Sequence, residues 1–151
     1  MEGREGRLAN NLFYACGLIE YIARLTHNTE DVIVSALGPA TLGHMIEYAD
    51  VLHCENIESV AARYIEEAGI VQGNDDSASN APYGLPSHWD MGKVYKRLVL
   101  GIMRERGVGP VEATMEAFRS PIAPLLRDYS GSFFYEAPEN VLIAHLTGAI
   151  E

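Results

Sequence analysis

The stretch LANNLFYACGLIEYIARL, residues 8–25, decides the fold class of this chain. Its apolar residues recur every three or four positions, which is the periodicity of an α-helix. They form two adjacent rows: Leu8, Leu12, Ala15, Ile19 and Ile22, then Tyr14, Leu18, Tyr21 and Leu25. At about 100° per residue the two rows cover about half of the helix circumference. A stripe this wide is typical of a helix onto which several others pack, so residues 8–25 are predicted to form the central helix.

Helical patterns dominate the rest of the chain as well. Apolar residues at helical spacing occur in residues 28–37, 42–52, 57–68 and 91–106, and shorter helices are predicted after Pro110, Pro121 and Pro138. Gly38-Pro39 predicts a break between two helices, because glycine ends helices and proline is tolerated at their first position. Asp90 is a plausible N-terminal cap for the helix predicted over residues 91–106. Apart from one short extended piece at residues 132–135, no segment indicates a β-strand.

These patterns predict an all-α fold. We expect a single domain over residues 1–151, built as a compact bundle of five to seven helices. The helices fall roughly into residues 8–69 and 90–148, joined by a loop over residues 70–89 that is rich in Gly, Pro, Ser, Asn and Asp. A chain of 151 residues can bury a sizeable core without a disulfide or a metal.

The net charge of −10 excludes several classes of partner. Binding to a nucleic-acid backbone or to an anionic membrane surface requires clustered Lys and Arg, so neither is expected. The first 80 residues hold 13 acids against four arginines, so the first half is an acidic body. Its carboxylates could attract a basic partner, or they could serve solubility alone. The residues that we expect on this acidic surface are Glu47, Asp50, Glu55, Glu58, Glu66 and Glu67.

Cytoplasmic localisation is predicted from the cysteine content and the N-terminus. Two cysteines, Cys16 and Cys54, are too few for a secreted disulfide scaffold. The opening residues MEGREGRL contain acids where a signal peptide needs a basic region. Charged residues also interrupt the apolar stretch at residues 8–25, so that stretch does not predict a membrane span.

Motifs for phosphate, dinucleotide, zinc and calcium binding are missing from the sequence, as is the nucleophile elbow of hydrolases. The five histidines share no helical spacing, so we expect no metal and no cofactor. The most reactive triplet is His53-Cys54-Glu55, in which Cys54 could act as a nucleophile and His53 as its base. Alternatively, His53 caps the preceding helix and Cys54 packs as a small apolar side chain.

A basic and aromatic segment begins at the end of the central loop. Trp89 lies just before Lys93 and Arg97, and tryptophan and arginine are favoured anchors of protein interfaces. This segment could bind a partner. It could equally be a solvated face that complements the acidic half, within one chain or between two copies.

The first half also resembles a known group of proteins over about residues 10–70. The similarity is carried by LIEYIARLT, residues 18–26, and by YADVLHCENIESVAARYI, residues 48–65. It is similar to small bacterial helical domains of unknown function that are often encoded beside an ADP-ribosyltransferase-like domain. The resemblance implies a role as an adaptor, a regulator or an antitoxin, and it implies no catalytic residues.

We therefore expect a protein-binding regulator or adaptor, which could restrain a toxin-like enzyme. The partner-binding residues would be Glu58, Glu66, Glu67, Trp89, Lys93 and Arg97. The alternative is a small enzyme that uses Cys54 with a histidine, either His53 or one brought near by folding. A third possibility is self-association, in which the acidic half of one copy meets the basic segment of another.

Overall fold

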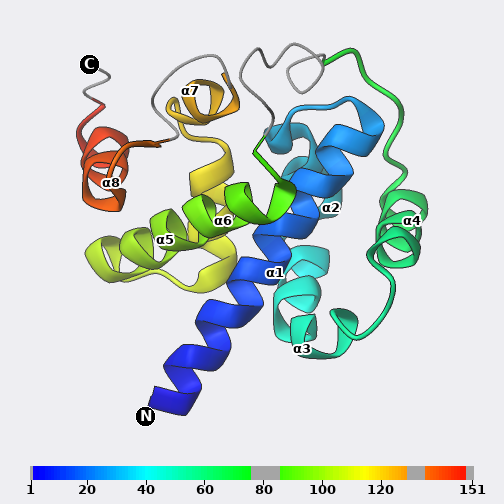
Figure 1. The fold of residues 1–151 in the computed structure, drawn as a ribbon, viewed down its shortest axis with the longest axis horizontal. Coiled ribbons are helices and arrows are strands. Elements are labelled where there is room, and N and C mark those ends of the chain that lie inside the picture. Colours follow the sequence, from blue (N-terminus) through cyan, green and yellow to red (C-terminus); the bar gives the residue numbers. More distant parts are fainter. Residues whose placement is uncertain (1, 76–85, 129–134, 149–151) are drawn as a thin grey trace.

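The computed structural model describes residues 2–75, 86–128 and 135–148. Within these ranges it contains eight α-helices and no β-strand, which confirms the predicted all-α class (Figure 1). The four helices of the first half are α1 (Glu2–Thr26), α2 (Glu30–Glu47), α3 (Ala49–Leu52) and α4 (Ile57–Ala68). Those of the second half are α5 (His88–Arg106), α6 (Pro110–Phe118), α7 (Ala123–Arg127) and α8 (Pro138–Thr147).

Helix α1 is the central helix, as its wide apolar stripe predicts. It contacts α5 on one side and α2, α3 and α4 on the other, and the chain wraps around it (Figure 1). Leu12, Leu18, Ile19 and Ile22 on this helix are completely buried. A helix enclosed on this many sides needs apolar residues over half of its circumference, which explains the double row in its sequence.

Helices α1 and α5 cross in close contact. A Cβ atom added to Gly92 would lie 2.9 Å from the Cα atom of Gly17, so the two backbones are in direct contact. A Cβ atom added to Gly17 would lie 2.4 Å from the ring of Trp89. The two glycines therefore allow α5 to lie against α1 and allow the indole ring of Trp89 to pack on α1 at Gly17.

Helix boundaries agree with the predicted signals at most places. Gly38 breaks α2 with a φ of 77°, a conformation that other residues rarely adopt, and α4 ends at Gly69 with a φ of 65°. The prediction that Asp90 caps α5 is wrong. Ser87 is the cap, and Asp90 accepts a hydrogen bond from the Ser87 backbone N–H as the second half of a capping box.

The central loop is described only at its two ends. Its first residues run along the end of α1, where the backbone N–H groups of Gly73 and Asp75 donate to the carbonyls of Thr26 and His27, each at 2.8 Å. Residues 76–85 lie outside the described residues, as do residues 132–134 of the predicted extended piece. None of the helices that the structure describes is long and apolar enough to cross a membrane.

Candidate functional site

The acidic surface extends from the end of α2 over α3 and the following turn to α4, at the opposite side of the molecule from α8 (Figure 1). Glu58, Glu66 and Glu67 on α4 are all exposed. At 100° per residue, Glu66 occupies the outermost line of the helix while Glu58 and Glu67 flank it, so the carboxylates span the whole exposed face. None of the three forms an ion pair with a residue that the structure describes.

Exposed apolar side chains flank the acidic residues at the end of α2 and in α3 along the sequence. Tyr48 is 45% exposed and Val51 is 59% exposed, and both neighbour acidic residues at the end of α2 and in α3. Asp50 and Glu55 are already partnered, by Arg7 at 3.1 Å and by Arg63 at 2.8 Å. Protein interfaces combine an apolar centre with a charged rim in this way.

The His53-Cys54 pair lies in the turn between α3 and α4. The Cys54 Sγ atom is 3.9 Å from the His53 Nδ1 atom and 3.7 Å from the Asp50 carbonyl oxygen, and Cys54 is exposed. The cysteine that packs in the core is Cys16, and burial raises the pKa of its thiol well above the ordinary range. His53 ends α3 through its backbone N–H, which donates to the carbonyl of Ala49.

A groove bounded by four aromatic side chains opens beside this turn. We call it the aromatic groove; it has a volume of about 1090 Å³. The indole of Trp89 lies 5.5 Å from the Phe13 ring and 5.8 Å from the Tyr14 ring, and Tyr14 in turn contacts His53 edge-on at 6.4 Å. Helices α1, α3 and α5 thus bring together residues that are far apart in the sequence.

Two polar groups lie inside the aromatic groove. Asn11 lines it and is only 7% exposed. The Tyr14 hydroxyl donates weakly to the carbonyl of Leu52 at 3.5 Å. Burial, with further contributions from Tyr64 and Glu55, raises the pKa of Tyr14 to about 12, so its hydroxyl stays protonated at neutral pH.

The predicted basic segment divides into two parts. Trp89 is half-buried against α1 and lines the aromatic groove, whereas Lys93 and Arg97 are exposed on α5. Lys96 is partly buried beside them, and burial together with the charges of Arg97 and Lys93 lowers its pKa. The structure therefore places Trp89 with His53 rather than on an exposed basic face.

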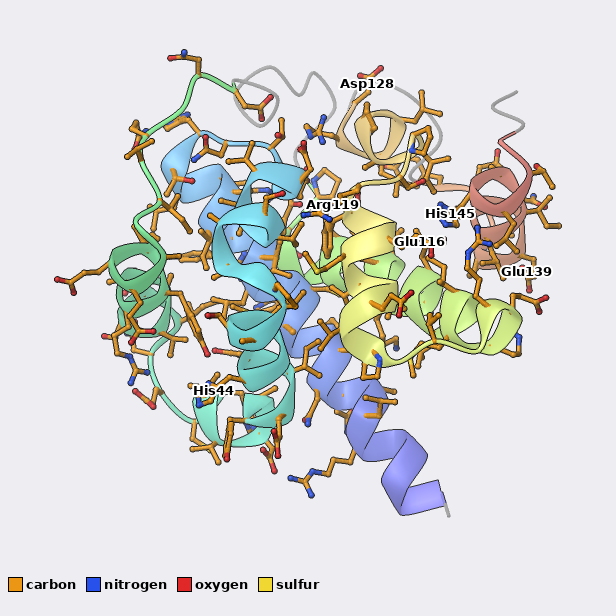
Figure 2. The ribbon with its side chains drawn as sticks, turned by 180° about the vertical axis from the view of Figure 1, so that it is seen from behind. His44, Glu116, Arg119, Asp128, Glu139 and His145 are labelled. Atoms are coloured by element: carbon orange, nitrogen blue, oxygen red, sulfur yellow. The ribbon has the colours of Figure 1, made fainter. Side chains whose placement is uncertain are left out.

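A hydrogen-bonded cluster that the sequence did not reveal joins α6 to α8. The imidazole of His145 lies 2.7 Å from the Ser120 Oγ atom and 2.5 Å from a Glu116 carboxylate oxygen, which also accepts from Arg106 at 2.6 Å (Figure 2). These are the residue types of a catalytic triad. Ser120 is only 4% exposed and the His145 side chain 5%, so a substrate has no access, and the cluster instead fixes α8 to the bundle.

A second buried cluster ties the end of α1 to α2 and α7. Glu20 pairs with Arg24 at 2.7 Å, and Glu30 pairs with Arg127 at 2.8 Å. Glu20 and Glu30 are 1% and 2% exposed and lie against each other. Burial, followed by the nearby Glu20 carboxylate, raises the pKa of Glu30 well above its ordinary value. Helical spacing predicts the Glu20–Arg24 pair, but Glu30 and Arg127 are 97 residues apart, so no local pattern could have predicted that the two pairs meet.

Within the described part of the chain, no group of three or more His, Cys, Asp or Glu side chains is placed to hold a metal ion. Comparison of the chain with protein-family models, with curated proteins and with solved structures finds no match.

Proposed function

We propose that this chain is a protein-binding regulator or adaptor whose acidic surface receives a basic partner protein. The observation that carries the proposal is the set of exposed carboxylates on α4, which have no cationic partner among the described residues. A surface with an excess of negative charge attracts a positively charged partner and accelerates the encounter.

Exposed apolar residues at the end of α2 and in α3 would supply the binding affinity that charge alone does not provide. Charge complementarity sets the rate and the specificity of association, whereas buried apolar contacts supply most of the affinity. Tyr48 and Val51 would form the apolar centre of the interface, and the glutamates of α4 its rim.

The test is quantitative affinity capture from the native lysate with two charge-reversed variants. In the first, Glu58, Glu66 and Glu67 are replaced by Lys. The matched control replaces Glu105, Glu112 and Glu139, which are exposed on other helices, and changes the net charge equally. One basic protein at near-equal stoichiometry, lost only with the first variant, is the expected result. Equal capture by both variants contradicts the proposal, and capture of a second copy of this chain favours self-association.

A second candidate function is nucleophilic chemistry at Cys54, favoured by its exposure and its 3.9 Å distance from His53 Nδ1. A base that assists the thiol should increase its reactivity toward iodoacetamide. The alkylation rate of folded protein at pH 6 should therefore fall in the His53→Ala variant. An unchanged rate eliminates His53 as the base.

A further inference from the structure

We infer that a groove between α2 and α4 receives one long cationic side chain, a lysine or an arginine, of the basic partner protein. This inference rests on the proposed function and adds to it the residue by which the partner is anchored. The groove, which we call the α2–α4 groove, has a volume of about 370 Å³. Its lining includes Ala40 and His44 from α2, Leu52 from α3, and Tyr64 and Glu67 from α4.

The carboxylate of Glu67 is the first observation behind this inference. Glu67 is exposed, lines the groove and forms no ion pair with any residue that the structure describes. The guanidinium of Arg63 lines the groove as well, but it is held by Glu55 at 2.8 Å and does not neutralise Glu67. Burial, followed by the nearby Glu67 carboxylate, raises the pKa of Tyr64, so this carboxylate lies near the buried tyrosine. A negative charge left open in the groove selects a cationic group as its occupant.

The apolar floor of the groove is the second observation, and it selects the length of the cationic side chain. Leu52 and Tyr64 line the groove and are 8% and 6% exposed. Lysine and arginine combine a long aliphatic stem with a charged end, and such stems lie along apolar surface while the charge reaches a polar group. A compact cation would gain nothing from the apolar floor, and an apolar side chain would leave the carboxylate without a partner.

The α2–α4 groove is continuous with the proposed interface. His44 lines the groove, and its imidazole lies 4.5 Å from the ring of Tyr48, which we assign to the apolar centre. Glu67 belongs to the groove and to the acidic surface alike. The carboxylates of α4 would attract the basic partner, and the groove would then hold one of its cationic side chains as an anchor.

Short peptides test the groove without the partner. The probes are capped glycine-X-glycine peptides in which X is arginine, lysine or citrulline, which has nearly the shape of arginine but no charge. Binding to the isotope-labelled protein is followed through the NMR chemical shifts of its backbone amides at low salt. The arginine or the lysine peptide should shift the amides of Leu52 and Tyr64 saturably. The citrulline peptide should bind about fivefold more weakly.

Three variants separate the groove from the general charge of α4. Glu67→Gln keeps the shape of the side chain and should weaken binding of the cationic peptide about fivefold. Glu66→Gln is the matched control, because it removes the same charge from the next residue, which does not line the groove, and it should change the affinity much less. Ala40→Leu narrows the groove without changing its charge and should also weaken binding. All three residues are exposed, so thermal unfolding should show folded proteins.

The inference is overturned if no cationic peptide binds saturably, or if the citrulline peptide binds as tightly as the cationic ones. Equal losses in Glu67→Gln and Glu66→Gln, or unchanged binding in Ala40→Leu, would also overturn it. These failures are distinguishable from a failure of the proposed function. Partner capture that depends on the α4 carboxylates while the groove binds no peptide would leave the proposed function in place. Peptide binding in the groove together with charge-independent capture would refute the proposed function.

Discussion

The contact between α1 and α5 predicts that Gly92→Ala destabilises the protein, although alanine is the better helix former. The added Cβ atom would lie 2.9 Å from both the Cα and the N atom of Gly17. Carbon atoms in contact prefer about 3.5–4.0 Å, so the helices would have to separate. Both sides of the contact are backbone, which means that no side-chain rotation can relieve it.

The loss of unfolding free energy in the Gly92→Ala variant is the difference between two opposing effects. Overpacking of this kind costs up to about 3 kcal/mol, and replacing glycine within a helix recovers about 1 kcal/mol. The net loss of unfolding free energy is therefore about 2 kcal/mol, which lowers the melting temperature of a chain of this size by roughly 4–8 °C.

Gly101→Ala on the same helix is the matched control. There the added Cβ atom meets only the side chain of Leu142, at 2.8 Å, and that side chain can rotate away. We expect a change within about 1 kcal/mol, because the gain in helix propensity offsets the repacking. Thermal unfolding of both variants by circular dichroism is the assay. A Gly92→Ala variant that melts at or above the wild-type temperature would refute the close backbone contact.

Three further predictions concern ionisable and reactive groups. Burial raises the pKa of Glu116, but hydrogen bonds from His145 and Arg106 outweigh it and lower the pKa overall. Glu116 therefore contributes stability above its unfolded pKa of about 4.3, which is lost as the pH falls through its lower folded pKa. Glu116→Gln should destabilise the protein at pH 7 and reduce its acid sensitivity in urea titrations. The pKa of Glu30 is raised, so the wild type should lose stability as the pH rises from about 4.3 through that folded pKa. Glu30→Gln should remove this loss, and a parallel pH profile in the two proteins would contradict it. Finally, Cys54 should react with iodoacetamide in the native state and Cys16 only after unfolding, as peptide mass spectrometry can measure.

The helical class and the central helix could be predicted because both depend on local periodicity. The double apolar row of residues 8–25 indicates how much of the surface of that helix is buried, but not which helices bury it. The sequence does not single out the cap of α5, because Ser87 and Asp90 belong to one capping box in which either residue is a plausible cap. Both have the sequence signature of an N-terminus, and only the backbone geometry distinguishes them.

The functional surfaces were predictable only in part. Exposure of Glu58, Glu66 and Glu67 follows from the amphipathic pattern of α4, which is strictly local. The aromatic groove depends on the crossing of α1 and α5, which brings Trp89 onto Phe13 and Tyr14. This contact between distant parts of the chain leaves no periodic pattern in the sequence. The sequence therefore indicates Trp89 as a candidate interface residue but not which residues it contacts.

The most direct measurement is the rate at which the captured partner associates with this protein at increasing salt concentration. With the wild type, the association rate constant should fall steeply as salt screens the acidic surface. Replacing Glu58, Glu66 and Glu67 by Lys should slow association at low salt and invert its salt dependence, while the dissociation rate changes less. An association rate that is the same in the wild type and the charge-reversed variant at every salt concentration would contradict the role of the acidic surface.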